Sequence, residues 1–397
     1  MRLTAILLFI ILSLKSFAQL DTIELKDMIA ICNSFTFLEL YNSDSAIIPA
    51  KYQKKYTSGV FGMDNKFQIY QCGSVAVINL RGSTAQKSSW MENIYSAMIP
   101  ATGRITASGE NFDYCFAKDP GAAVHAGYAL GLAFLHNEII YHINDLNKEG
   151  IYNIIITGHS QGGALANMLR AYLENLSHNE LSKKNKFKTY AYAAPKTGNK
   201  KISDEYNARF ERTNSSFNIV NVSDPIPTFP LSYNDTSTLT DYVKNLLVDR
   251  QNFNLKKVIA DGMANFSEPT IRSNVQKLST AASGQISKDL GPVNMPDYVK
   301  DISYSALKNR IEIETFDFPK VLKDSSILKN QQIMATLKKG KDGYFSNQDL
   351  YIKESWIYQH KPYNYYAAIL KRYFPHDYGL LKKKYLPENI GSEAAEK

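Results

Sequence analysis

The sequence predicts an α/β protein in which a mostly parallel sheet carries helices on both of its faces. Two observations favour this fold class. Short segments rich in β-branched residues alternate with helical patterns through the first 230 residues, and several of the strand segments end in small or polar residues. Such alternation is typical of open parallel sheets. Helical patterns dominate afterwards, which predicts one domain over 19–397 with a mainly helical insertion, or cap, at about 231–347.

The expected elements follow from apolar composition and spacing. The strands, in chain order, are 66–70, 75–80, 151–157, 188–194 and 217–222. The helices are 23–40, 90–98, 124–146, a segment that begins after residue 160, and 363–373. A loop rich in Gly, Thr and Ser is expected over 100–109. Inside the insertion, 239–248 and 274–287 have helical patterns, and the strand-like piece 310–318 is assigned to the insertion rather than to the sheet.

The amino terminus has the pattern of a secretory signal. Arg2 precedes an apolar run over 3–14, and Ser16 and Ala18 form a small-residue cleavage site before Gln19. The run is too short to span a bilayer. We therefore predict that residues 1–18 are removed and that the protein is secreted or periplasmic, with a retained amino-terminal anchor as the alternative.

The charge balance is mildly basic. Lys and Arg number 46 against 38 Asp and Glu, a formal net charge of +8. The lysine clusters at 183–186 and 382–384 are interpreted as solvated surface, with a weak attraction to anionic membrane surfaces as the alternative. No nucleic-acid-binding motif accompanies them, so nucleic acid is not an expected partner.

The cysteines exclude a disulfide-rich scaffold. Cys32, Cys72 and Cys115 are an odd number, so at most one disulfide is expected, and the sequence does not decide which pair would form it. No Cys/His cluster has the spacing of a metal site. Neither a metal nor another cofactor is expected.

The pentapeptide GHSQG at 158–162 is the first candidate for chemistry. It stands between the apolar strand 151–157 and a helical pattern, so Ser160 occupies a sharp strand-to-helix turn. Glycines suit such a turn because they remove Cβ atoms where the backbone is crowded. The start of the helix also directs free N–H groups at a ligand of the serine. Ser160 is therefore predicted to be a nucleophile, and a plain turn serine is the alternative.

A nucleophilic serine needs a carboxylate and a histidine base. In α/β-hydrolases the acid follows the serine and lies at the carboxyl end of a strand. Asp224 ends the strand segment SFNIVNVSD and is the predicted acid, with a turn cap as its alternative role. Asp204 lies in a polar helical segment, and Asp235 and Asp241 fall at the start of the insertion, so these three are less suitable.

The base must follow the acid, which leaves His360 and His376. His360 lies in a loop just before the final helix and is the predicted base, whereas His376 lies beyond that helix. His159 is expected to point away from the serine and to pack or to support the site. The oxyanion hole is predicted from the amide of Gln161 and from Ser83, which follows the strand 75–80 and could offer both its amide and its hydroxyl.

These motifs together resemble the class 3, fungal-type lipase family. The segments that carry the resemblance are VAVINLRGST, AAVHAGY, IIITGHSQGGALA, TYAYAAPKTGN and NIVNVSDPIPTFP. The resemblance implies an α/β-hydrolase fold, with Ser160, Asp224 and His360 as the triad and Ser83 and Gln161 as the oxyanion hole. It also implies a helical lid at SSWMENIYSAMIP, where Trp90, Ile94 and Met98 would share an apolar face. A core helix is the alternative for that segment.

The resemblance further implies a secreted serine ester hydrolase that cleaves acylglycerol-type lipid esters through an acyl-enzyme. Its partner would be a lipid or ester substrate at a membrane or lipid interface. One departure leaves the substrate open: 136 positions separate Asp224 from His360, far more than in compact members. The alternatives are a phospholipase A1, a feruloyl-type esterase or a thioesterase on the same fold. A catalytically silent binding protein and a membrane-surface interaction protein are the others.

Overall fold

The strands expected from the sequence form the central sheet of the protein, for which a computed structural model provides the coordinates. The structure describes residues 20–34, 47–84, 86–230, 280, 283–300, 303–314, 316–352 and 358–381. The predicted signal segment 1–18 and the helical stretch 239–248 lie outside these residues and stay predictions. In the described part of the chain, no helix is both long enough and apolar enough to cross a membrane.

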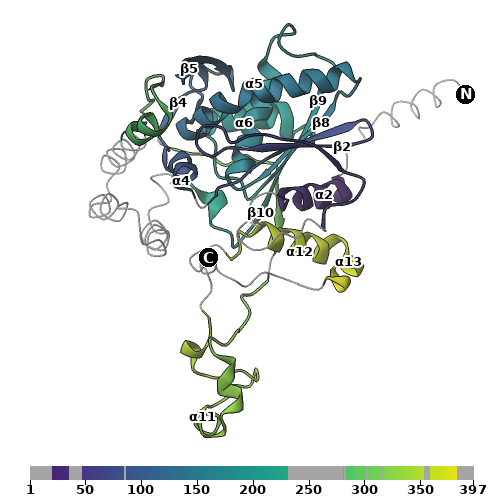
Figure 1. Cartoon of the computed structure of the whole chain (residues 1–397), viewed down its shortest axis with the longest axis vertical. Coiled ribbons are helices and arrows are strands. Elements are labelled where there is room, and N and C mark those ends of the chain that lie inside the picture. Colours follow the sequence, from purple (N-terminus) through teal and green to yellow (C-terminus); the bar gives the residue numbers. More distant parts are fainter. Residues whose placement is uncertain are drawn as a thin grey trace, which may run out of the picture.

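The central sheet has seven strands in the order β1-β2-β3-β8-β9-β10-β12. The first two pair antiparallel with each other and with the third, and all later neighbours are parallel. Their bounds are β1 Gln53–Thr57, β2 Phe67–Cys72, β3 Val75–Leu80, β8 Asn153–His159, β9 Lys186–Tyr192, β10 Ser216–Asn221 and β12 Arg310–Ile313. The predicted fold class, a mostly parallel α/β sheet, is confirmed (Figure 1).

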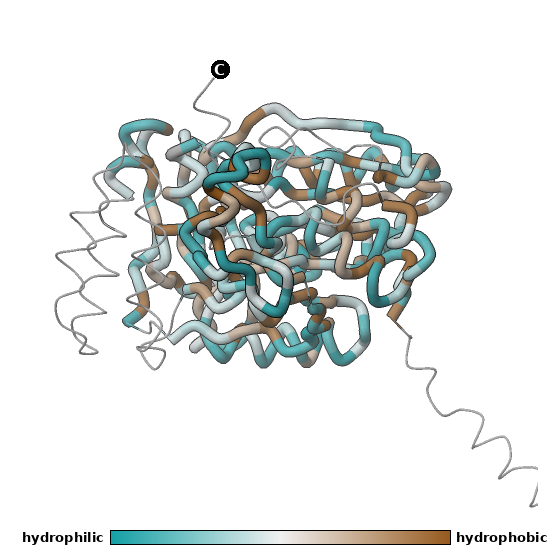
Figure 2. The backbone as a smooth tube through the Cα atoms, turned by 90° about the horizontal axis from the view of Figure 1, so that it is seen from below, coloured by the Kyte–Doolittle hydropathy of each residue, from teal (hydrophilic) through white to brown (hydrophobic). Residues whose placement is uncertain are grey.

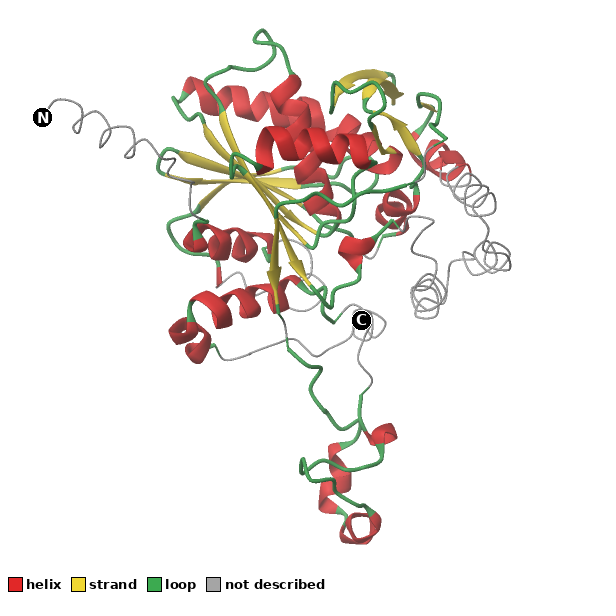
Figure 3. Ribbon diagram, turned by 180° about the vertical axis from the view of Figure 1, so that it is seen from behind, coloured by secondary structure: helices red, strands yellow, loops and turns green. Residues whose placement is uncertain are grey.

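Helices cover both faces of this sheet, as Figure 3 shows from behind. Alternate residues of a strand point to opposite faces, so Ile154 and Ile156 of β8 pack in one core and Ile155 packs in the other. The first core holds α5 (Ala126–Lys148) and α6 (Gln161–Asn175), and the second holds α2 (Thr22–Cys32) and α12 (Pro362–Tyr373). Hydrophobic stretches of backbone run mainly through the interior of the body, whereas its outer turns are largely hydrophilic (Figure 2).

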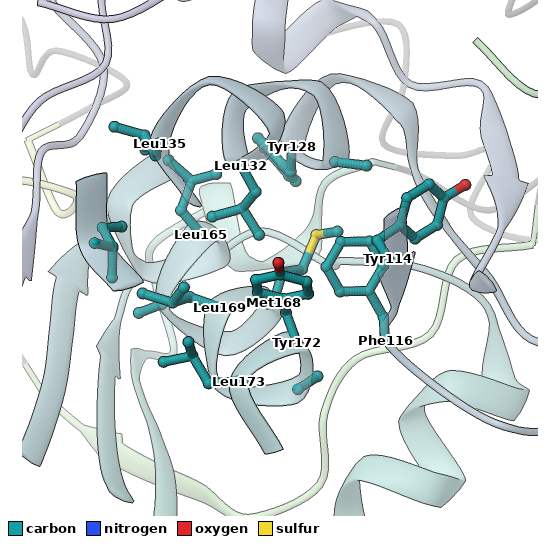
Figure 4. Packing of buried hydrophobic residues seen from close by; sticks show 14 of the residues in the cluster. Tyr114, Phe116, Tyr128, Leu132, Leu135, Leu165, Met168, Leu169, Tyr172 and Leu173 are labelled. Atoms are coloured by element: carbon teal, nitrogen blue, oxygen red, sulfur yellow. The ribbon is translucent and has the colours of Figure 1, made fainter. Parts of the chain in front are cut away.

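Aromatic and leucine side chains fill the space between α5 and α6. The i, i+3 and i+4 spacing of apolar residues puts them on facing sides of the two helices. Figure 4 labels Tyr128, Leu132 and Leu135 of α5 and Leu165, Met168, Leu169, Tyr172 and Leu173 of α6, together with Tyr114 and Phe116 from the neighbouring segment 114–116. This packing holds the amino-terminal end of α6, which bears the predicted nucleophile, against the sheet.

The segment 90–109 differs from its prediction. The helix α4 spans Lys87–Ile94 and ends before Met98, which instead begins β4 (Met98–Pro100), paired with β7 (Ala123–His125). The expected loop at 100–109 is largely the strand β5 (Thr102–Ala107), which pairs with β6 (Glu110–Cys115). The turn between them uses positive φ at Ser108 and Gly109. The Gly, Thr and Ser content that suggested a loop reflects a short, solvated hairpin instead.

The assignment of 310–318 to the insertion was wrong for its first four residues. Arg310–Ile313 forms β12 and pairs in parallel with β10, at the edge of the main sheet. The long connection before it hid this pairing, because an edge strand of four residues has too weak a pattern to reveal its neighbour. Residues 283–290 are helical, and β11 (Val293–Asn294) then pairs with β5. Residues 231–279 lie outside the described ranges, so the helical character expected there stays a prediction.

Candidate active site

Ser160 lies in the turn between β8 and α6, in a backbone conformation that is rare for a residue with a side chain. Its φ is 59° and its ψ is −128°. Such strain persists only where the surroundings hold it. Here the amide of Ser160 donates to the carbonyl of Tyr192 in β9, at 2.9 Å, and its carbonyl accepts from the amides of Gly163 and Ala164. The turn therefore presents the serine side chain at the carboxyl edge of the sheet.

Close backbone approaches explain the glycines of the pentapeptide. A Cβ atom on Gly158 would lie 2.3 Å from the carbonyl oxygen of Gly162, and one on Gly162 would lie 2.2 Å from that of Leu80. Both contacts are with backbone, which cannot swing aside. Gly158 and Gly162 are therefore required by the sharp turn at Ser160 and by the close contact of α6 with β3.

The structure brings together the three side chains predicted from the sequence to form the triad, Ser160, Asp224 and His360. Nε2 of His360 lies 2.8 Å from Oγ of Ser160, and Nδ1 of His360 lies 2.8 Å from Oδ2 of Asp224. With the proton on Nδ1, His360 donates to the carboxylate and accepts from the serine hydroxyl. Ser160, Asp224 and His360 are 7%, 3% and 4% exposed. Burial strengthens each of these polar contacts by excluding water.

Asp224 has two further donors. The amide of Ile226 donates to Oδ1 at 2.9 Å, and the hydroxyl of Tyr365 donates to Oδ2 at 2.7 Å. Burial and then the charge of Asp224 raise the pKa of Tyr365 well above its usual value, so this hydroxyl keeps its proton. Tyr365 was not identified from the sequence. The only available hint was its place in α12 five residues after His360, which does not distinguish it from the neighbouring tyrosines.

The other histidines and aspartates considered from the sequence take no part in this arrangement. His376 is exposed in α13 (Pro375–Leu380), and Asp204 forms ion pairs with Lys200 and Lys308. Asp235 and Asp241 lie outside the described residues. His159 is buried with its ring 4.6 Å from that of His360, and burial followed by the nearby His360 holds its pKa well below the usual value. It is therefore a neutral packing neighbour of the base.

The loop after β3 packs directly against the turn that carries Ser160. A Cβ atom on Gly82 would lie 2.7 Å from the carbonyl oxygen of His159, so only glycine allows this approach. Ser83 follows, and its hydroxyl donates to Oε1 of Gln161 at 2.8 Å. The expectation that this hydroxyl is available to a substrate is therefore not met in this conformation, because its one proton is already directed at Gln161.

The side chain of Gln161 is the centre of a polar cluster that the sequence did not predict. Its Oε1 accepts from Ser83 Oγ, Ser89 Oγ and Asn93 Nδ2 at 2.8, 3.2 and 3.0 Å. Asn93 in turn accepts from the hydroxyl of Tyr128 on α5, at 3.0 Å. One carboxamide thus joins the loop after β3, the helix α4 and the start of α6.

A buried carboxyl group extends this cluster. Oε2 of Glu92 accepts from Asn65 Nδ2 at 2.6 Å, and Asn65 Oδ1 accepts from Gln161 Nε2 at 3.4 Å. Burial raises the pKa of Glu92 to about 8. Cβ atoms on Gly127 and Gly131 of α5 would clash with Glu92, so these glycines let α4 lie close to α5.

These contacts bear on the lid that the family resemblance implied. Met91 and Tyr95 are members of the main core, and Trp90 and Ile94 are half-buried, whereas Met98 has left the helix for β4. The helix α4 therefore has the position of the alternative, a core helix, and its Asn93 is hydrogen-bonded to Ser83 in the loop after β3.

The described residues contain no group of His, Cys, Asp and Glu side chains arranged to hold a metal ion. Cys32, Cys72 and Cys115 are free thiols. Burial raises the pKa of Cys32 to about 12, so this thiol is unreactive at neutral pH.

Comparison with known proteins finds one family model and several solved structures that are similar to this chain. Residues 77–234 match the model of the family described as lipase (class 3). Among solved structures, the chain is similar to a triacylglycerol lipase with a serine protease triad as its catalytic centre, at 19% identity over 54% of this chain and 76% of that one, with a TM-score of 0.40. It is also similar to a lipase from Rhizopus microsporus var. chinensis, at 20% identity over 53% and 69% of the two chains, with a TM-score of 0.39.

The matched range contains the elbow serine, the loop after β3 and the candidate acid, while His360 lies beyond it. The sheet order, the strained turn at Ser160 and the parallel strands on either side are those of an α/β-hydrolase. Residues 77–234 match the model of the class 3 lipase family, and the chain has the α/β-hydrolase fold and the serine, histidine and aspartate arrangement of a carboxylic ester hydrolase.

Proposed function

We propose that this protein is a secreted lipid ester hydrolase that cleaves acylglycerol-type carboxylic esters through an acyl-enzyme on Ser160. The observation that carries the proposal is the unbroken hydrogen-bonded chain from Ser160 through His360 to Asp224. The class 3 lipase match supports a lipid ester as the substrate. Secretion rests on the sequence pattern of residues 1–18 alone.

The proposed reaction begins when Oγ of Ser160 attacks the ester carbonyl carbon and gives its proton to Nε2 of His360. Asp224 stabilises the imidazolium through Nδ1. The amides of Gln161 and Ser83 donate to the carbonyl oxygen as it becomes negative, and loss of one such donor costs about 3 kcal/mol of transition-state stabilisation. His360 then protonates the departing alcohol, and the carbon–oxygen bond to it breaks.

Water completes the cycle. His360 takes a proton from a water molecule, which attacks the acyl-serine, and the carboxylic acid leaves as Ser160 regains its proton. Because Ser160 is only 7% exposed, an ester reaches it only after local rearrangement of the residues around it. We propose this rearrangement as part of substrate binding.

Covalent labelling with a fluorophosphonate tests the mechanism. Wild type should label at Ser160, and Ser160→Ala should not. Equal labelling of the two proteins, or no labelling of wild type under conditions where it is folded, would contradict the proposal. Hydrolysis rates for triacylglycerols, phospholipids, feruloyl esters and thioesters then separate the proposed substrate class from the alternatives.

A further inference from the structure

A protruding segment, residues 321–352, stands apart from the body of the molecule. We call it the arm. Backbone contacts close its base: the amide of Lys323 donates to the carbonyl of Leu350, and that of Ile352 donates to the carbonyl of Val321. Its tip holds the short helices at Ser325–Lys329 and α11 (Gln331–Thr336). Figures 1 and 3 show the arm extending away from the sheet beyond the ends of the last strands.

The arm is attached at the catalytic edge of the sheet. β8, β10 and β12 run parallel, so their carboxyl ends lie at one edge, where Ser160 follows β8 and Asp224 follows β10. The chain enters the arm after the carboxyl end of β12 and leaves it shortly before His360. Both connections of the arm therefore start from the edge that carries the three candidate catalytic side chains.

Side-chain contacts secure this attachment. The ring of Phe318 packs edge to face on Tyr358, with ring centres 4.9 Å apart. Gln359 Nε2 donates to the carbonyl of Phe316 at 3.2 Å, and Gln359 Oε1 accepts from Asn221 Nδ2 at 3.1 Å. The segment 316–318, which leads into the arm, thus contacts the two residues directly before His360.

The surface of the arm is unusually apolar for exposed chain. Leu328, Ile333 and Tyr344 are 52%, 41% and 46% exposed, and Ile352 is 37% exposed. These are four of the ten large apolar or aromatic side chains that are exposed in the described part of the chain. Leu328 and Ile333 lie on the two neighbouring short helices at the tip. This concentration of exposed apolar side chains in one projecting segment favours contact of the arm with another phase or molecule.

The positive charge of the arm indicates that it contacts a negatively charged surface. Five lysines of the arm are exposed: Lys323, Lys329, Lys338, Lys339 and Lys341. Against them stand three aspartates, of which Asp342 is paired with Lys320 at 2.7 Å and Asp324 accepts from the amide of Ser326. A segment that exposes both aliphatic side chains and lysines matches the boundary between acyl chains and anionic headgroups.

We infer that the arm docks the protein on an anionic lipid surface. Leu328 and Ile333 enter the boundary between headgroups and acyl chains, and the exposed lysines of the arm contact lipid phosphates. This places the catalytic edge of the sheet beside the surface that supplies the ester. The purpose of the docking rests on the proposed lipid esterase function, whereas the docking itself does not.

Co-sedimentation of the full chain with vesicles tests this inference. The vesicles are phosphatidylcholine with and without phosphatidylglycerol. Leu328→Asp/Ile333→Asp should weaken binding to the mixed vesicles at least about tenfold, because two buried aliphatic contacts are lost and two negative charges face anionic lipid. Lys338→Glu/Lys339→Glu should weaken binding only to the anionic vesicles, and by less at high salt.

The matched control is Ile23→Asp/Val60→Asp, which alters two aliphatic side chains that are 54% and 58% exposed on the body. It should bind like wild type. All variants share residues 1–18, so this apolar segment contributes equally to each. Thermal unfolding and hydrolysis of a soluble short-chain ester should be unchanged throughout.

Two results would overturn the docking role: wild-type vesicle binding by the Leu328/Ile333 variant, or an equal loss in the control. A protein that binds vesicles through the arm but hydrolyses no ester would instead contradict the proposed function and leave the docking intact. A protein that hydrolyses esters but binds vesicles independently of the arm would contradict the docking role and leave the proposed function intact.

Discussion

Tyr365 donates a hydrogen bond to Oδ2 of Asp224, the same oxygen that lies 2.8 Å from Nδ1 of His360. The tyrosine hydroxyl also accepts from the amide of Asn221, at 2.9 Å. Tyr365 thereby links the carboxylate of Asp224 on one side to the end of β10 on the other, and it anchors both to α12. The direction of this carboxylate toward His360 therefore depends on Tyr365.

We predict that Tyr365→Phe lowers kcat about tenfold with little change in KM, because the carboxylate loses a donor that orients it. The change also leaves the buried amide of Asn221 without its acceptor, which should destabilise the fold by about 1–3 kcal/mol. Steady-state kinetics and urea unfolding measure the two effects. Tyr373→Phe, at the end of the same helix, is the control and should show neither. Wild-type kinetics in Tyr365→Phe would argue against a positioning role.

Asp224→Asn should reduce kcat by about 10⁴. An amide has one acceptor oxygen, so it cannot accept from Ile226 at one end and from His360 and Tyr365 at the other as the carboxylate does. With the NH2 group toward His360, the imidazole loses the tautomer that accepts from Ser160. Kinetics with a soluble ester, alongside circular dichroism to verify folding, measure the loss. A reduction below about tenfold would point to another acid.

Gln161→Leu should lower kcat more than it changes KM, by roughly ten- to a hundredfold. The substitution retains the backbone amide at this position but removes the acceptor shared by Ser83, Ser89 and Asn93. The loop after β3 would then be less well positioned for the developing oxyanion. The rate of fluorophosphonate labelling should fall in parallel, and Gln53→Leu, in an exposed part of β1, should leave both rates unchanged. Equal rates for the two variants would exclude this role for the side chain.

Glu92 should make stability depend on pH. Its pKa is raised from 4.5 to about 8 in the folded protein, so the folded state binds this proton more tightly than the unfolded state. The stabilisation of the fold by the protonated Glu92 is therefore fully present below about pH 4.5 and is lost as the pH rises to about 8. Over that window the free energy of unfolding falls by at most about 1.4 kcal/mol per pH unit from this group.

Glu92→Gln isolates the effect, since other buried groups such as His125 titrate in both proteins. Urea unfolding at pH 5 and at pH 8.5 should show a smaller decrease in the variant than in wild type. A decrease of the same size in both proteins would mean that Glu92 is ionised at neutral pH after all.

Gly162→Ala should prevent correct formation of the elbow. The added methyl would lie 2.2 Å from the carbonyl oxygen of Leu80, a contact that only a shift of α6 away from β3 can relieve. We expect loss of activity and a lower unfolding temperature, measured by fluorophosphonate labelling and thermal unfolding. Gly59→Ala is the control, because a Cβ atom there meets nothing within 4 Å. A labelled, stable Gly162→Ala protein would show that the turn tolerates the side chain.

Much of the fold and the candidate site could be read from local pattern. The Ile-rich strand and the helical spacing around GHSQG predicted the turn at Ser160, because these periodicities are set within a few residues. Asp224 and His360 were predicted from chain order and from their places after a strand and before a helix. The structure then places the imidazole of His360 at 2.8 Å from both Asp224 Oδ2 and Ser160 Oγ.

Other features were beyond the reach of local pattern. The expected loop at 100–109 is a hairpin, and β12 joins the sheet although its four residues follow a long connection. Neither pairing has a signal within its own segment, because a strand's partner depends on where distant chain returns.

The sequence by itself determined the elbow, the order of serine, acid and base, and the apolar strands of a parallel sheet. Only the tertiary structure decided that Tyr365 steadies Asp224, that the side chain of Gln161 joins three elements, and that α4 lies in the core. The physical reason is the separation along the chain: Tyr365 and Asp224 are 141 residues apart, and Gln161 and Ser83 are 78 apart. Such contacts arise only when helices and loops from distant positions pack on the same edge of the sheet, which no local periodicity encodes.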